Sequence, residues 1–95
     1  MRKPSKISIL GQEIKIVYKD ILDDNCCGLF HPDTMDIEIK KDKYWRSTLI
    51  HEIIHAILCI SGATELVTDK IEEALVCAIE SGLKDIITLK YKPKT

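Results

Sequence analysis

Hydrophobic and polar residues alternate along the N-terminal half of the chain. In "ISILGQEIKIVYKD", apolar residues take every second position on both sides of Gly11, a pattern that predicts a β-hairpin with strands near 6–10 and 13–19. The stretch "MDIEIK" at 35–40 alternates in the same way and predicts a half-buried strand. With a short extended piece at "GLF" (28–30), we expect three or four mostly antiparallel strands.

The C-terminal half has helical spacing instead. We expect a first helix that begins at Asp42 as N-cap and ends near Ile60, with Gly62 in its C-terminal turn. A second helix is expected over about 65–88. The strands precede the helices, and no repeat or linker separates them. The pattern therefore predicts one α+β domain over 1–95, with a small sheet packed on two helices.

Composition and charge exclude several classes of protein. The chain has 95 residues, of which 45% are hydrophobic and 31% charged, as in globular rather than disordered proteins. A net charge of −1 gives no reason to expect nucleic acid or an acidic membrane as partner. The sequence has no apolar run of membrane-spanning length and no signal-peptide core, so we expect a cytoplasmic protein. The short termini, 1–5 and 91–95, are expected to be flexible.

The four cysteines do not form a recognisable framework. Cys26 and Cys27 are adjacent in an acidic, turn-rich loop (20–28), whereas Cys59 and Cys77 fall within the expected helices. Because no CxxC spacing occurs, we expect neither disulfides nor a thiolate zinc site. A loop thiolate that reaches a metal is a weaker alternative to ordinary exposed thiols.

The stretch "TLIHEIIHAILC" carries the chemistry. His51 and His55 lie one turn apart on the same helix face, so both imidazoles can bind one ion at about 2.0–2.1 Å. Glu52 points about 100° away, beside the ion but not bound to it, where its carboxylate can accept a proton from a metal-activated water. The alternative is a chance match with hydrogen-bonded core histidines. Such a match is roughly a one-in-several-hundred event in a chain this short.

A third ligand must come from elsewhere, because no histidine follows His55. Cys59 lies a further helical turn along and is more consistent with a wall of the site. The second helix supplies carboxylates and an apolar stripe: Ile71, Leu75, Val76, Ala78, Ile79, Gly82, Leu83 and Ile86. Glu72 falls inside this stripe and is the predicted ligand, with Glu73 and Asp69 as alternatives. Glu73 shares the opposite face, expected to be solvated, with Glu80.

These segments resemble a known group of proteins. "IEIKKDKYWRSTLIHEIIHAILCISG" and "IEEALVCAIESGL" are similar to small phage-type HExxH zinc metallopeptidases, which are gluzincin-like and related to the ImmA/IrrE-like metallopeptidases. The resemblance covers roughly 28–83. It implies a minimal zincin-like fold in which strand 35–40 is an edge for an extended substrate. It also implies a site made of His51, His55 and Glu72 as zinc ligands and Glu52 as base. Leu75 stands where alanine usually follows the third ligand, which leaves Glu72 and Glu73 both open.

Two functions follow as expectations. The first is a zinc metallopeptidase that hydrolyses peptide bonds of a protein or peptide substrate through a metal-activated water, with Glu52 as general base. The second is a zinc-stabilised binding or regulatory module with weak or no hydrolytic activity, because 95 residues leave little room for a deep cleft. Candidate donors to stabilise an oxyanion are His31, Tyr44 and Tyr91.

Overall fold

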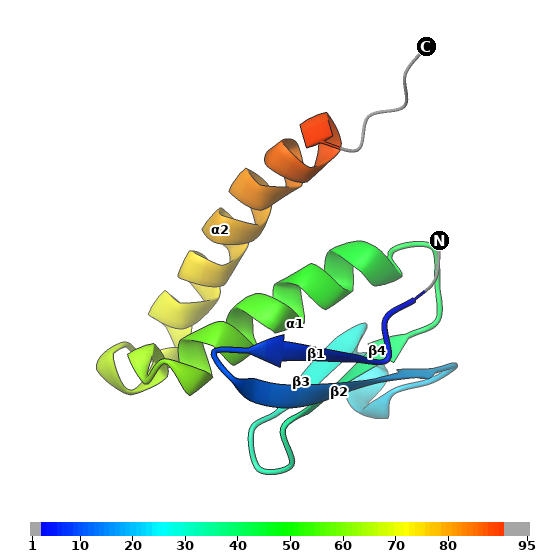
Figure 1. Cartoon of the computed structure of the whole chain (residues 1–95), viewed down its shortest axis with the longest axis horizontal. Helices are drawn as coiled ribbons and strands as arrows, with labels where there is room; N and C mark the ends of the chain where they lie inside the picture. Colours follow the sequence, from blue (N-terminus) through cyan, green and yellow to red (C-terminus); the bar gives the residue numbers. More distant parts are fainter. Residues whose placement is uncertain (1–2, 91–95) are drawn as a thin grey trace.

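The fold is α+β, with a four-stranded mixed sheet and two α-helices (Figure 1). The computed structural model describes the backbone of residues 3–90 and the side chains of residues 3–23 and 25–83. Its elements in chain order are β1 (Lys6–Ile9), β2 (Gln12–Lys19), the 3-10 helix η1 (Asp23–Asn25), β3 (Gly28–His31), β4 (Asp36–Lys40), α1 (Trp45–Ile60), the 3-10 helix η2 (Ala63–Leu66) and α2 (Asp69–Lys90). The coarse prediction of strands followed by helices is therefore confirmed.

The strand order in the sheet is β1-β2-β4-β3. Strands β1 and β2 form the predicted hairpin, and both residues of its tight turn have positive φ, 50° at Leu10 and 82° at Gly11. Two antiparallel pairings, β1 with β2 and β3 with β4, flank one parallel pairing of β2 with β4. The sheet is therefore mixed. After β2 the chain forms β3 at the outer edge, and β4 then lies between β2 and β3, parallel to the first and antiparallel to the second.

The expectation that strand 35–40 forms an edge is wrong. Strand β4 is paired on both sides, so that Ile37 stands opposite Ile16 of β2 and Phe30 of β3. The short strand β3 is the edge on this side of the sheet. The sequence gives little sign of this arrangement, since β3 has only four residues and begins with Gly28.

The helix ends differ in part from the sequence predictions. The N-cap of α1 is Tyr44, two residues later than the expected Asp42, because the Asp42 carboxylate accepts the N–H of Tyr44 at 2.8 Å and shapes a turn before the helix. Gly62, with φ of 86°, follows its C-terminus as predicted. The expected second helix is two segments, η2 and α2. Thr68 Oγ1 accepts the N–H of Ile71 at 3.2 Å at the start of α2.

Helix α1 covers one face of the sheet, and α2 packs against α1 (Figure 1). Isoleucines at 14, 37 and 39 on the sheet are fully buried beneath α1, together with Ala56. On α2 the inward residue is Val76, which is also fully buried, whereas Ile71, Leu75 and Ile79 remain 41–50% exposed. Apart from Val76, the described residues of the apolar stripe of α2 are therefore exposed, and the neighbours of Val76 one turn away, Glu72 and Glu80, face α1.

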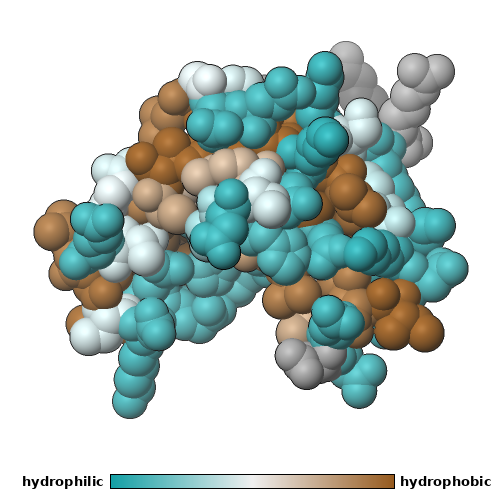
Figure 2. Space-filling model, turned by 90° about the horizontal axis from the view of Figure 1, so that it is seen from below, coloured by the Kyte–Doolittle hydropathy of each residue, from teal (hydrophilic) through white to brown (hydrophobic). Residues whose placement is uncertain are grey.

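Hydrophobic and hydrophilic side chains are interspersed on the surface seen from below in Figure 2. No helix among residues 3–90 has the length and apolar character needed to cross a bilayer. The predicted flexible segment 91–95 lies outside the described residues. At the other end, the Tyr18 hydroxyl donates to the Pro4 carbonyl at 2.7 Å, and Lys3 Nζ lies 5.4 Å from the ring centres of both Tyr18 and Trp45.

Gly28 marks the closest approach of the edge strand to α1. A Cβ atom at this position would lie 2.6 Å from Thr48 Cγ2 and 3.1 Å from Glu52 Cγ. We expect Gly28→Ala to destabilise the protein by about 1–3 kcal/mol through overpacking, measured as a lower urea midpoint. Thr48→Ser removes the clashing methyl group, so Gly28→Ala should cost less in that background. An equal cost in both backgrounds would show that this contact does not limit the approach.

Candidate metal centre

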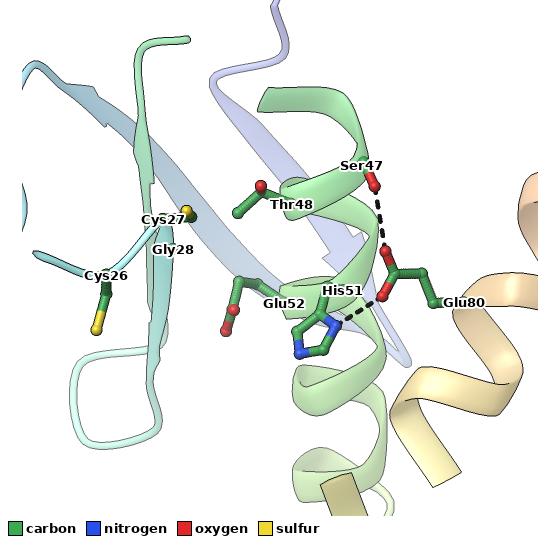
Figure 3. Close-up of a pocket in the computed structure, with 8 residues that line it drawn as sticks. All are labelled: Cys26, Cys27, Gly28, Ser47, Thr48, His51, Glu52 and Glu80. Atoms are coloured by element: carbon green, nitrogen blue, oxygen red, sulfur yellow. Dashed lines mark hydrogen bonds and ion pairs between the residues drawn. The ribbon is translucent and has the colours of Figure 1, made fainter. Parts of the chain in front are cut away.

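Helix α1 presents its polar residues to two different neighbours. His51 and His55 lie one turn apart on the face toward α2, and their ring centres are 5.0 Å apart. Glu52 lies on the side toward β3 and is only 9% exposed. Figure 3 shows His51 directed at α2 and Glu52 directed at the strand that begins with Gly28. One rigid helix thus places two imidazoles and a carboxylate between the edge strand and α2.

The Nε2 atoms of the two histidines meet at one carboxylate of α2. Glu73 Oε1 lies 3.0 Å from His51 Nε2, and Glu73 Oε2 lies 3.1 Å from His55 Nε2. One nitrogen or oxygen from each of these three residues lies within 4.8 Å of the others. Ligands of a tetrahedral ion with bonds of 2.0–2.1 Å lie about 3.3 Å apart. His51, His55 and Glu73 can therefore hold a metal ion.

The Nδ1 atoms contact two further carboxylates. His51 Nδ1 lies 2.7 Å from Glu80 Oε1, and His55 Nδ1 lies 2.7 Å from Glu72 Oε2. Each ring therefore has a carboxylate oxygen at both nitrogens, although a neutral imidazole carries only one N–H. In a neutral ring the other nitrogen has no proton, so it and the carboxylate oxygen beside it would both be hydrogen-bond acceptors. A cation between the Nε2 atoms and Glu73 removes this conflict, so the residues present fit a bound metal.

The charges around the histidines shift two pKa values. Burial by itself would lower the pKa of His51, but the hydrogen bond to Glu80 and the negative charges of Glu52 and Glu73 raise it. Burial raises the pKa of Glu52, against the opposing effects of His55 and His51 and of a hydrogen bond from the Phe30 backbone. The site thus attracts positive charge, either as protons or as a metal ion, and Glu52 holds a proton more readily than an exposed glutamate.

For the third ligand, the structure favours the alternative Glu73 over the predicted Glu72. Glu72, the residue expected to bind the metal, lies at the Nδ1 atom of His55, whereas the alternative Glu73 lies at both Nε2 atoms. Asp69, the other alternative, is exposed and does not belong to the group. Glu80 was expected on the solvated face but is 22% exposed and contacts His51. The physical reason is the orientation of α2, which turns Val76, Glu72 and Glu80 toward α1 and leaves Ile71, Leu75 and Ile79 41–50% exposed.

Two pockets open on either side of Glu52, and both are lined by Gly28, His51 and Glu52. The first has a volume of about 370 Å³ and reaches Ser47, Thr48, Glu80 and the two loop cysteines (Figure 3). The second, of about 400 Å³, runs along Leu29, Phe30 and Pro32 and includes Cys59 and Thr64 in its wall. The Thr64 hydroxyl is buried and has no hydrogen-bond partner among the described residues. The group of His51, His55 and Glu73 therefore borders a groove that extends in two directions.

The residues suggested as oxyanion donors lie elsewhere. His31 Nε2 is 2.8 Å from Glu38 Oε1, and Tyr44 is 62% exposed. Neither residue lines the two pockets, and Tyr91 lies outside the described residues. Among the described side chains, the expected donor is thus not found at these positions.

Comparisons with models of protein families, with curated proteins and with solved structures found no match to this chain.

Metal content distinguishes the two adjacent glutamates. We expect one equivalent of zinc to bind the unaltered protein, and Glu73→Ala to abolish this binding because a carboxylate ligand is lost. Glu72→Ala should still bind one equivalent at saturating zinc, since the Nε2 atoms and Glu73 remain. Equilibrium dialysis followed by elemental analysis measures both values. Loss of zinc from Glu72→Ala together with full binding by Glu73→Ala would reverse the ligand assignment.

Proposed function

We propose that this protein is a zinc-dependent metallopeptidase with a minimal zincin-like fold. The observation that carries the proposal is the buried carboxylate of Glu52 beside two imidazoles whose Nε2 atoms converge on Glu73. Two histidines and one glutamate are a ligand set found in catalytic zinc sites, which leave a position open. A zinc ion held by these three residues would lower the pKa of a water molecule and polarise a substrate carbonyl.

Glu52 has the position of a general base. Its carboxylate lies between the two pockets and accepts a hydrogen bond from the Phe30 backbone N–H, which fixes its orientation. Because burial raises its pKa, this carboxylate can accept a proton from the attacking water and later donate it to the leaving amine. The likeness of the HExxH segment to small phage-type metallopeptidases supports the same role.

The substrate proposed for this site is an extended protein or peptide segment. Strand β3 pairs with β4 on one side, and on the other side the N–H of Phe30 donates to the Glu52 carboxylate. An edge strand can bind an extended chain through main-chain hydrogen bonds. A peptide laid along β3 would pass over Glu52 and through both pockets. This edge replaces strand 35–40, which is paired on both sides.

A zinc-stabilised binding or regulatory module is the second candidate. It is favoured by the absence of His31 and Tyr44 from the residues that line the two pockets, because peptide hydrolysis benefits from a donor to the oxyanion. In that case the same groove would bind a peptide with weak or no cleavage.

Replacement of the base separates these two functions. We expect Glu52→Gln to keep one equivalent of zinc but to lower kcat/KM for a fluorescently labelled unfolded protein about 10²–10⁴-fold, since general base catalysis is lost. The exposed Glu65 provides a matched control, and Glu65→Gln should leave both quantities unchanged. Full activity in Glu52→Gln would refute the proposed mechanism. An unaltered protein that binds zinc and peptide without cleaving it would support the binding module.

A further inference from the structure

Two carboxylates of α2 contact the histidines at the nitrogens that face away from Glu73. Glu80 and Glu72 each bring one oxygen to 2.7 Å from an Nδ1 atom, that of His51 and that of His55 respectively. Their side chains are 22% and 16% exposed, whereas that of Glu73 is 55% exposed. Each histidine thus has a carboxylate at its Nδ1 atom, and the side chains of these two glutamates are less exposed than that of Glu73.

We propose that Glu72 and Glu80 are positioning residues that fix the tautomer and orientation of the two metal-binding imidazoles, an inference that rests on the proposed function. An ionised carboxylate can only accept a hydrogen bond, so it places the single proton of a neutral imidazole on Nδ1. The lone pair of each ring then lies on Nε2, directed at the position beside Glu73. Carboxylates in this role orient metal-binding histidines and increase their basicity.

The two positioning carboxylates have different surroundings. The Ser47 hydroxyl donates to Glu80 Oε2 at 3.1 Å, so both oxygens of Glu80 are occupied, and Figure 3 shows the chain from Ser47 through Glu80 to His51. Glu72 lies in the first turn of α2, where the helix dipole stabilises negative charge. Its own N–H donates to the Thr68 carbonyl at 2.9 Å. The bond from Ser47 limits how far the Glu80 carboxylate can move from its imidazole.

The role makes a graded prediction for zinc affinity. Glu80→Ala and Glu72→Ala should each weaken zinc binding about 10–100-fold while one equivalent still binds at saturation, the range found for residues that orient metal ligands. Glu80→Gln should lose less than Glu80→Ala, because the amide oxygen still accepts from Nδ1–H. The matched control is Glu65→Ala, which should keep the affinity of the unaltered protein.

The experiment is a competition for zinc against a chromophoric chelator, with circular dichroism to verify folding of each variant. NMR of the imidazole groups in the zinc-loaded protein provides a second measurement. We expect a slowly exchanging Nδ1–H of His51 in the unaltered protein, its loss in Glu80→Ala and its retention in Glu80→Gln. A merely structural role of Glu80 would change stability but not the order of these affinities.

The possible failures are distinguishable. If the unaltered protein binds zinc and both alanine variants bind it with the same affinity, the positioning role is overturned and the proposed function stands. The same conclusion holds if Glu80→Gln is as weak as Glu80→Ala and the Nδ1–H signal is absent from the unaltered protein. If the unaltered protein binds no zinc, the proposed function fails, and the positioning role fails with it.

Discussion

The meeting of acidic side chains with two imidazoles is the interaction on which the site and the helix pair depend. Helix α2 brings Glu72, Glu73 and Glu80 to the two histidines of α1, and Val76 is the one fully buried residue between the glutamates that flank it. Ile71, Leu75 and Ile79 contribute little to this interface, because they are 41–50% exposed. The contact between the helices is therefore largely polar. A cation at its centre would stabilise the packing of α2 as well as complete the site, and metal binding would then be coupled to folding.

The second constraint is the close approach of β3 to α1. Gly28 allows the edge strand to pass within contact distance of Thr48 and Glu52. Two residues further along the strand, the backbone of Phe30 supplies a hydrogen bond to Glu52. The Glu52 carboxylate is thus held by the sheet, whereas the nitrogens of the two histidines contact carboxylates of α2. Because Glu52, His51 and His55 all lie on α1, the geometry of this one helix determines how the carboxylate is placed relative to the two imidazoles.

The sequence was most informative where local spacing determines the result. The alternation around Gly11 predicted the hairpin, Gly62 predicted the end of the first helix, and the spacing of His51 and His55 predicted their shared face. Tertiary arrangement was less accessible. The pairing of β4 on both sides depends on β3, which is too short to give an alternating pattern.

The third ligand shows why helical phase alone was insufficient. The prediction of Glu72 assumed that the longest apolar stripe of the second helix would face the core. In the structure Val76 is the only described member of that stripe that is buried, and the face toward α1 also carries Glu72 and Glu80, which contact the histidines. The orientation of the helix depends both on the burial of apolar side chains and on electrostatic contacts between the two helices. The periodicity of one helix gives no information about contacts with the other. The seven-residue spacing of Glu73 and Glu80 did indicate a common face, but this face was expected to be solvated.

The proposed zinc site is formed by His51, His55 and Glu73. It is tested most directly by diffraction from zinc-loaded crystals at the zinc absorption edge, which locates the ion by anomalous scattering. We expect one ion at about 2.0–2.1 Å from the Nε2 atoms of both histidines and from a Glu73 oxygen, with Glu72 and Glu80 at the Nδ1 atoms. An ion bound by Glu72 in place of Glu73, or no ion at the histidines, would contradict it.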